Sequence, residues 1–362
     1  MIRKLIYIVI FVGLFMFIPL RAAGEEIYTI SDNSYETEEI NLKIAAEEFT
    51  GATDFVFRSS PALRGRIEIL STEDDSIEIY YHKIMSAESV DQARSFAELI
   101  DVKYEISSNT FIVSAEAERD APWRKTADLS GKIECEIYLP AEFSLNMSLV
   151  GYYINIKGPF PEAEITGEYC DEIRVSRIDL GLKVNADNST VILRDINGPT
   201  LIQGERTGIT ARNVNSGLGI ASFENKRGSI SLVGFSGDEL RCIAEEGKIT
   251  LEKLTLANGS RVYVSNSGIN SDIYVDLEEL NDSRLEIFNK EADITMLLPI
   301  QAEAEFEVTA DPDFGEIEFN GIPLITEDVG WGKLKARTQD SNSRIFMDTR
   351  GAGKIDVRRK DF

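Results

Sequence analysis

Apolar residues recur in the same arrangement three times between residues 182 and 235. Each repeat holds two short runs in which apolar and polar residues alternate, and this period of two is typical of a strand that buries one face. The apolar positions of the three second runs are Val191, Leu193 and Ile196, then Ile209, Ala211 and Val214, then Ile230, Leu232 and Phe235. Because one strand pair cannot bury its own apolar face, the recurrence predicts units that stack into a solenoid with a continuous core.

The first apolar residue of each second run is an anchor that can be followed along the chain. It is always β-branched and recurs at intervals of 18 to 24 residues, as expected if strands are fixed and turns absorb insertions. The anchors are Ile154, Ile173, Val191, Ile209, Ile230, Ile249, Ile273, Ile294 and Ile317. The pattern predicts an all-β, single-chain β-solenoid of about nine coils, on the order of 40 Å long, with the anchors stacked inward. An antiparallel β-sandwich is the alternative, because alternation alone does not distinguish parallel from antiparallel pairing.

Residues 1–24 have the features of a secretory signal peptide. Arg3 and Lys4 give a basic start, an apolar run follows, and small residues end the segment at Gly24. Cleavage after Gly24 is predicted, with an uncleaved membrane anchor as the alternative. The sequence therefore predicts an exported protein that is periplasmic, associated with the outer envelope or extracellular.

Residues 25–130 are predicted to form a β-rich region with one helix. The helix is expected at about residues 87–100, after Ser86 or Ser89 as the N-cap. Its apolar residues fall three or four apart and form one buried stripe. They are Val90, Ala93, Phe96, Ala97 and Ile100. Such a helix either packs on a sheet face or covers an open end of the solenoid, whose repeats begin at Gly131 and occupy residues 131–362.

Three segments carry a family resemblance. They are Ile137-Tyr-Leu-Pro140, the late-coil stretch from Asp293 to Pro299, and the closing Gly353-Lys-Ile-Asp-Val357. From about residue 60 to its end, the chain resembles the putative adhesin domains of bacterial envelope proteins, a family of unknown function with a β-solenoid fold. The resemblance implies a fold and a cell-envelope location, and it assigns no catalytic residues.

The chain is strongly acidic. Its formal net charge is -24, and removal of Arg3, Lys4 and Arg21 with the signal segment takes it to -27. Nucleic acids and anionic lipid surfaces are bound through Lys and Arg, so both are disfavoured as partners. After signal removal, no stretch is apolar enough to span a membrane.

Few residues are suited to nucleophilic or metal-assisted chemistry. His82 is the only histidine, and no Ser-His-Asp, Cys-His or His-metal pattern surrounds it. Cys135 and Cys242 fall on the apolar phase of their strands, which indicates buried side chains. Cys170 lies near a turn, where it either pairs with Cys135 or stays free. The sequence thus predicts no catalytic, cofactor-binding or metal-binding residues and no cofactor.

Two weaker candidates come from loops and aromatic side chains. Asp311 and Asp313 with Glu316 supply oxygens for calcium, but they are fewer than the six to eight ligands that this ion takes, so a plain loop is favoured. Exposed aromatic side chains would stack on sugars or proteins, or else pack in the core and turns. The candidates are Tyr152, Tyr153, Phe160, Phe288 and Trp331.

Two functions from different classes fit these observations. The first is a non-catalytic, exported binding or scaffolding protein, similar to adhesins, whose partner is an unidentified protein or polysaccharide of the envelope or the extracellular space. The second is a carbohydrate-active enzyme of the right-handed β-helix type, in which carboxylates from adjacent coils form a site without a linear motif. Glu134 with Glu136, and Asp272 with Asp293, are the pairs to test for such clustering.

Overall fold

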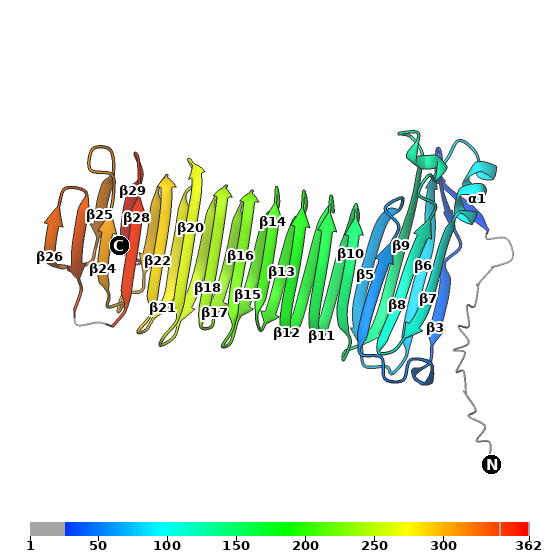
Figure 1. The fold of residues 1–362 in the computed structure, drawn as a ribbon, viewed down its shortest axis with the longest axis horizontal. Helices are drawn as coiled ribbons and strands as arrows, with labels where there is room; N and C mark the ends of the chain where they lie inside the picture. Colours follow the sequence, from blue (N-terminus) through cyan, green and yellow to red (C-terminus); the bar gives the residue numbers. More distant parts are fainter. Residues whose placement is uncertain (1–25, 340–341, 361–362) are drawn as a thin grey trace, which may run out of the picture.

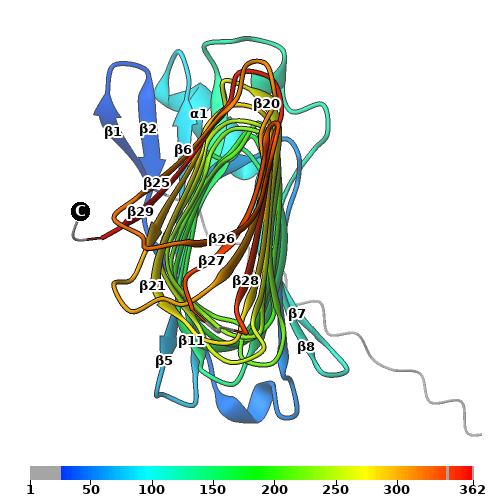
Figure 2. The same ribbon diagram turned by 90° about the vertical axis from the view of Figure 1, so that its left-hand side faces the viewer.

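Alternating apolar residues build two long sheets that face each other and enclose one hydrophobic core. The computed structural model describes residues 26–339 and 342–360, so the predicted signal segment and its cleavage site lie outside the described residues. Figure 1 shows a rod with its strands across the long axis, and Figure 2 shows the flattened tube from its C-terminal end. The predicted all-β solenoid is confirmed.

The first sheet contains the leading strand of each coil. From the N-terminal end of the rod its strands are β7 (Ile100–Ser107), β8 (Thr110–Ala117), β4 (Asp54–Ser59), β10 (Ser144–Val150), the second halves of β11 (Tyr152–Glu168) and β12 (Glu172–Asp187), β14 (Thr200–Glu205), β16 (Ile220–Arg227), β18 (Glu239–Glu246), β20 (Arg261–Ile269), β22 (Arg284–Glu291), β28 (Arg344–Thr349), β24 (Glu305–Thr309), β27 (Lys333–Arg337) and β26 (Ile325–Gly330). Pairing is parallel from β8 to β24, which excludes the antiparallel sandwich.

The second sheet contains the trailing strand of each coil. Its strands are β1 (Ile27–Ser31), β2 (Ser34–Thr37), β3 (Ile40–Ile44), β6 (Ile77–Ser86), β9 (Ser130–Pro140), β5 (Arg64–Thr72), the first halves of β11 and β12, β13 (Thr190–Asn197), β15 (Gly208–Asn215), β17 (Ile230–Ser236), β19 (Ile249–Leu256), β21 (Ile273–Leu280), β23 (Ile294–Leu298), β29 (Lys354–Arg359) and β25 (Glu316–Asn320). Pairing is parallel from β9 to β25.

The predicted inward ladder is present. Val191 pairs with Ile209, Ile209 with Ile230, and Ile230 with Ile249, and each side chain is at most 1% exposed. Such burial of a β-branched side chain removes its whole apolar surface from water, which stabilises the fold by about 1.5–3 kcal/mol per residue. The ladder is therefore the continuous core that the repeat required.

A left-handed residue in β13, β15 and β17 explains why the apolar spacing in these strands changes from two to three. In β13, Leu193 and Ile196 both point inward because Asp195 between them has φ 54° and rotates the strand by one position. Asn213 (φ 55°) and Gly234 (φ 80°) occupy the same place in the next two coils. Asn and Gly adopt this conformation at little cost, so the turn chemistry fits the repeat.

The C-terminal strands do not follow the order of the sequence. Ile294 pairs with Ile355 of β29, and Ile355 pairs with Ile317 of β25, so β29 lies between the two anchors that the sequence placed next to each other. In the same way β28 lies between β22 and β24. The expected direct step from Ile294 to Ile317 is therefore wrong. Leu334 also belongs to an antiparallel strand, β27, and does not open a parallel coil.

The N-terminal end of the stack is also out of sequence order. We call one strand of each sheet at the same level of the rod a layer. Strands β4 and β5 form a layer between β8/β9 and β10/β11. Strand pairing therefore continues without a break across residue 131, where the repeats were predicted to begin. With these layers and β28/β29, twelve two-strand layers stack among the described residues, three more than the nine anchors indicated. The three added layers carry Cys135, Ile67 and Ile355 at the anchor position.

The predicted helix is α1 (Val90–Glu98), the only α-helix in the described part of the chain. Two short 3-10 helices, η1 (Ala46–Glu48) and η2 (Pro122–Arg124), are also present. Ser89 is the N-cap of α1 and accepts a hydrogen bond from the Gln92 N–H. The helix packs on β6, and Phe96 meets Trp123 edge-on with ring centroids 5.3 Å apart. It therefore covers part of the N-terminal end of the rod (Figure 1).

Candidate functional site

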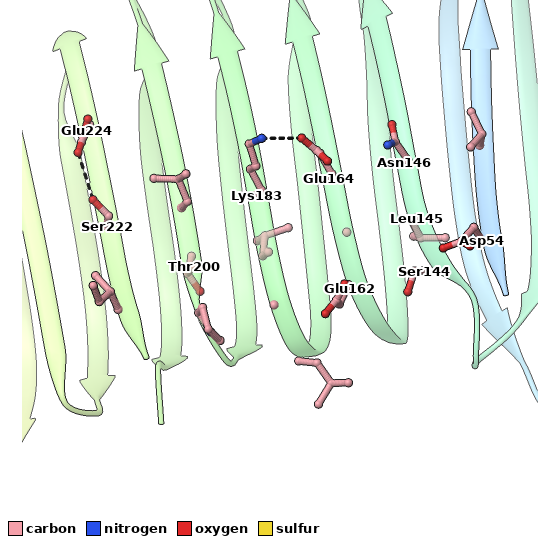
Figure 3. Close-up of a pocket in the computed structure, with 18 of the residues that line it drawn as sticks. Asp54, Ser144, Leu145, Asn146, Glu162, Glu164, Lys183, Thr200, Ser222 and Glu224 are labelled. Atoms are coloured by element: carbon pink, nitrogen blue, oxygen red, sulfur yellow. Dashed lines mark hydrogen bonds and ion pairs between the residues drawn. The ribbon is translucent and has the colours of Figure 1, made fainter. Parts of the chain in front are cut away.

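A shallow trough of about 930 Å³ runs along the outer face of the first sheet. Its floor is a row of outward side chains from β10 to β18, in which each residue is the strand partner of the next. The row consists of Asn146, Glu164, Lys183, Leu201, Ser222 and Arg241. We call this surface the outer trough; Figure 3 shows that its residues come from successive parallel strands.

One rim of the outer trough is apolar and exposed. Leu180 is 62% exposed and Ile220 is 47% exposed, and Pro199 lies between them along the same row of turns. The trough is hollow because the residues beside this rim, such as Gly181 and Ser222, are small. Exposed apolar residues that gather along a depression mark interaction sites more often than scattered ones do.

The two cations of the outer trough each pair with a carboxylate one coil away. The Lys183 Nζ atom lies 2.7 Å from Glu164 Oε1, and both side chains are about half exposed. Further along, Glu224 accepts a hydrogen bond from the Ser222 hydroxyl at 3.3 Å and lies 3.8 Å from Arg241 Nε. These exposed pairs add little stability, and the trough remains acidic because five carboxylates and two cations line it.

The floor of the trough continues directly into a group of aromatic side chains. Arg241 is the strand partner of Tyr263 in β20, and Tyr263 is the partner of Glu286 in β22, which in turn pairs with Phe346 in β28. Phe288 lies next to Tyr263, with ring centroids 5.7 Å apart. The sequence had indicated Phe288, whereas Tyr263 and Phe346 were missed.

A second hollow, of about 190 Å³, lies on the outer face of the second sheet near the N-terminal end. Here β6 brings His82 opposite Glu134 of β9, and the His82 Nε2 atom is 3.8 Å from Glu134 Oε2. Glu136 and Glu68 line the same hollow, so the pair Glu134 and Glu136 does share one face. With Glu39, the structure thus brings together four carboxylates and the histidine that the sequence left isolated.

Hydrogen bonds from neighbours occupy two carboxylates of this hollow, Glu68 and Glu136. Burial acts to raise the pKa of Glu68, but a hydrogen bond from Arg66 and the charges of Arg66 and Lys157 outweigh it and lower the pKa. Glu136 accepts the Tyr138 hydroxyl, and this bond raises the pKa of Tyr138 to about 12. Glu68 is therefore suited to remain ionised, which does not fit a general acid that must hold a proton near neutral pH.

The other carboxylate candidates have local structural partners. Asp272 lies 3.1 Å from Lys248 Nζ, and Asp293 accepts the Lys354 N–H at 2.8 Å, so each is held at a turn. Asp311 accepts the N–H groups of the two residues at Asp313 and Phe314, both at 3.0 Å, as in an Asx turn. Across the described ranges, no group of three or more His, Cys, Asp or Glu side chains is arranged to hold a metal ion.

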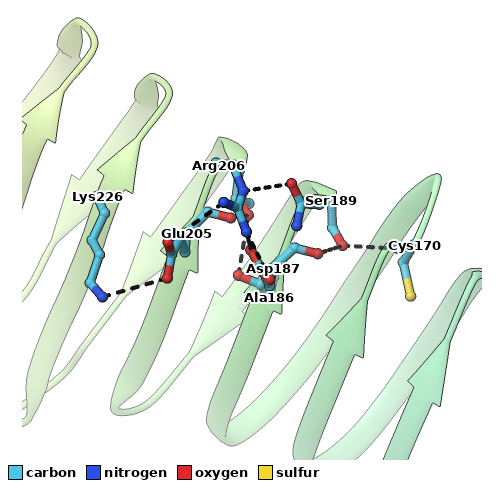
Figure 4. A network of polar contacts seen from close by, with 9 residues as sticks. Cys170, Ala186, Asp187, Ser189, Glu205, Arg206 and Lys226 are labelled. Carbon is cyan, nitrogen blue, oxygen red and sulfur yellow. Dashed lines mark hydrogen bonds and ion pairs between the residues drawn. The ribbon is translucent and has the colours of Figure 1, made fainter.

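All three cysteines are free and buried. The possible pairing of Cys170 with Cys135 is therefore not formed. Burial raises the pKa of all three thiols, which keeps them protonated. The Cys170 N–H donates to the Ser189 hydroxyl at 3.1 Å (Figure 4). Next to it, along the corner of the rod, the Arg206 guanidinium donates to the Asp187 carboxylate at 3.2 Å.

The remaining predicted aromatic residues are divided between core and surface. Tyr152 and Phe160 are fully buried. Tyr153 lies on the outer face of the second sheet, where the Arg66 guanidinium sits 4.9 Å from its ring centroid. Trp331 is 78% exposed at the C-terminal end, and its indole N–H donates to the Pro312 carbonyl at 2.7 Å. No helix in the described residues is long and apolar enough to cross a membrane.

Two solved structures match most of the chain. One is described as a putative cell adhesion protein from Clostridium sporogenes; it is 11% identical, and the match covers 89% of this chain and 99% of that chain with a TM-score of 0.22. The other is described as a putative adhesin from Parabacteroides merdae, at 9% identity, with 88% and 95% covered and a TM-score of 0.29.

No protein-family model and no curated protein matches the chain. Both TM-scores are below 0.5, so these matches do not assign the fold. The solenoid fold is assigned from the strand pairing of this chain. Both matching structures are described as putative adhesion proteins.

Proposed function

We propose that this chain is a non-catalytic, exported β-solenoid that acts as an adhesin-like binding or scaffolding protein of the bacterial cell envelope. The observation that carries the proposal is the outer trough, whose floor takes one side chain from each of several successive coils. A surface of this shape suits an extended partner, a protein or a polysaccharide, better than a small substrate. The segment up to Gly24 would direct the export.

The chemistry of the side chains supports binding. Burial raises the pKa of the thiols, so they stay protonated and do not offer a nucleophilic thiolate. Arg66 lowers the pKa of Glu68, so this carboxylate stays ionised and does not offer an acidic proton. The net charge of -24 favours a neutral, basic or cation-bridged partner.

Capture from envelope extract tests this function. The mature protein is immobilised and exposed to extract at two ionic strengths, beside Leu201→Asp in the trough and Thr250→Asp on the outer face of the second sheet. We expect capture by the wild type and by Thr250→Asp, and its loss with Leu201→Asp. Equal capture by all three would refute the trough as the binding surface. Mass spectrometry of the exported protein, with Ala23 to Glu25 as the region of interest, tests cleavage after Gly24.

The alternative is a carbohydrate-active enzyme, and the hollow around His82 is the observation that favours it. Four carboxylates line this hollow: Glu39, Glu68, Glu134 and Glu136. A depolymerisation assay on acidic and neutral polysaccharides is the test, with Glu134→Gln as the matched variant. Sustained turnover that disappears in the variant would replace the binding function with the enzymatic one.

A further inference from the structure

We propose that the outer face of β20, β22 and β28 is a binding site for a neutral polysaccharide, whose sugar rings stack on the aromatic side chains there. We call this surface the aromatic platform: Tyr263, Phe288 and Phe346, flanked by Arg241 and Arg284. The inference rests on the proposed binding function and names the class of partner. The sequence indicated Phe288 as a candidate, but not the group of three, because Phe346 joins it only through the insertion of β28 beside β22.

The rings of the platform stand on neighbouring parallel strands. Tyr263 in β20 and Phe288 in β22 have ring centroids 5.7 Å apart with their planes inclined by 42°. Tyr263 is 36% exposed, and Phe288 and Phe346 are partly exposed, although both alternate with fully buried neighbours. Ring faces held at this spacing match the C–H faces of pyranose rings, which pack on aromatic side chains in the same offset manner as other apolar rings.

The charge around the platform selects a neutral ligand. The Arg241 guanidinium lies 6.0 Å from the Tyr263 ring centroid and pairs with Glu224, and that of Arg284 lies 4.9 Å from the Phe346 ring centroid. Arg284 in turn pairs with Glu286 at 2.6 Å. Both of these cations are balanced by a carboxylate, whereas Arg261, the exposed strand partner of Arg284, carries a further positive charge beside Tyr263. An anionic polymer is disfavoured because the protein as a whole is strongly acidic. Paired carboxylates and guanidinium groups do supply acceptors and donors for sugar hydroxyl groups.

The platform and the outer trough form one track along the rod. Ser222 on the trough floor pairs with Arg241, and Arg241 pairs with Tyr263, so the row of outward side chains passes from trough to platform without a gap. Successive positions on this row are about 4.8 Å apart, the spacing of strands in a sheet. A sugar chain lying along the rod therefore meets a new side chain with about every unit.

Affinity electrophoresis with soluble polysaccharides tests the inference. The probes are two neutral glucans with β-1,3 and β-1,4 linkages, a neutral mannan, and polygalacturonate as the anionic comparison. The test variant is the double substitution Tyr263→Ala with Phe346→Ala, and the control is Tyr274→Ala. Tyr274 is a matched residue because it lies in the same coil, is partly exposed, and points outward from the second sheet. Circular dichroism melting confirms that all the variants fold.

We expect at least one neutral polysaccharide to retard the wild type and Tyr274→Ala equally, and to bind the double variant about tenfold or more weakly. Retardation by polygalacturonate alone, equal retardation of all variants, or no retardation by any neutral probe would overturn the inference. If no neutral probe binds while capture from envelope extract persists, the partner is of another class and the proposed function stands. If capture fails as well, the proposed function falls too.

Discussion

Substitutions at three isoleucines test whether β29 lies between β23 and β25. Ile294 and Ile355 are strand partners with fully buried side chains, whereas Ile317 lies one strand further along the rod. Single substitutions to Ala at Ile294 and Ile355 should each lower the free energy of unfolding by about 2–5 kcal/mol, because each leaves a cavity in the core. Ile317 is only partly buried, so its substitution should cost less.

Double-mutant cycles separate the two possible strand orders. Ile294→Ala and Ile355→Ala remove side chains that touch, so their effects should differ from additivity by about 0.5–3 kcal/mol. Ile294 and Ile317 are separated by one strand, a distance of about 9.6 Å, and their effects should add to within about 0.5 kcal/mol. Ile273 with Ile294 is the positive control, because these neighbours pair in either strand order.

Urea unfolding followed by far-UV circular dichroism supplies the free energies. The dependence of the unfolding free energy on urea must stay constant across the variants, because a changed slope would signal a partly unfolded rod and not a local loss of packing. Strong coupling between Ile294 and Ile317, with additivity between Ile294 and Ile355, would refute the insertion and restore the sequential order of coils.

Three further predictions follow from burial and charge. Ile230→Asp buries an unpaired carboxylate and should destabilise the protein by several kcal/mol. Ser231→Asp, on the outward-facing side of the same strand, should change stability by no more than about 0.5 kcal/mol. Equal melting temperatures would refute the assignment of inward and outward residues. Burial raises the pKa of the three thiols, so Ellman's reagent should not label the native protein at pH 8 and should label three cysteines in urea; fast native labelling would contradict their burial. The hydrogen bond from Arg358 lowers the pKa of Asp356, so its contribution to stability is present above about pH 4 and is lost as the pH falls through the lower folded value. Wild type and Asp356→Asn should therefore differ in unfolding free energy most at neutral pH and converge in acid, and a constant difference would contradict the pairing.

The repeat pattern was sufficient to predict the middle of the fold. Val191, Ile209, Ile230 and Ile249 lie on adjacent coils that are also adjacent in sequence, so the spacing of apolar residues identifies each strand partner directly. The pattern failed at the ends for a topological reason. Ile355 stacks between Ile294 and a residue 38 positions before it in the chain, and no spacing rule reports a strand that returns to an earlier layer.

The candidate sites were less predictable than the fold. Glu134 and Glu136 were found as a pair because they alternate on one strand, but the approach of His82 depends on the antiparallel pairing of β6 with β9. Tyr263 and Phe346 are 83 residues apart and become neighbours of one strand, β22, only through the insertion of β28. Their position between buried residues, which marks them as outward-facing, was the one signal in the sequence that pointed to them.

The inserted C-terminal strands also have a consequence for the order in which the chain is made. During synthesis, β24 and β25 emerge before β28 and β29, yet they have no parallel partner in the stack until those later strands take their places. We therefore expect a chain that ends before residue 342 to stop its ordered stack at β22 and β23, with two open strand edges available to other chains. Chains that stop before β28 and β29 should therefore be the ones that aggregate or are degraded.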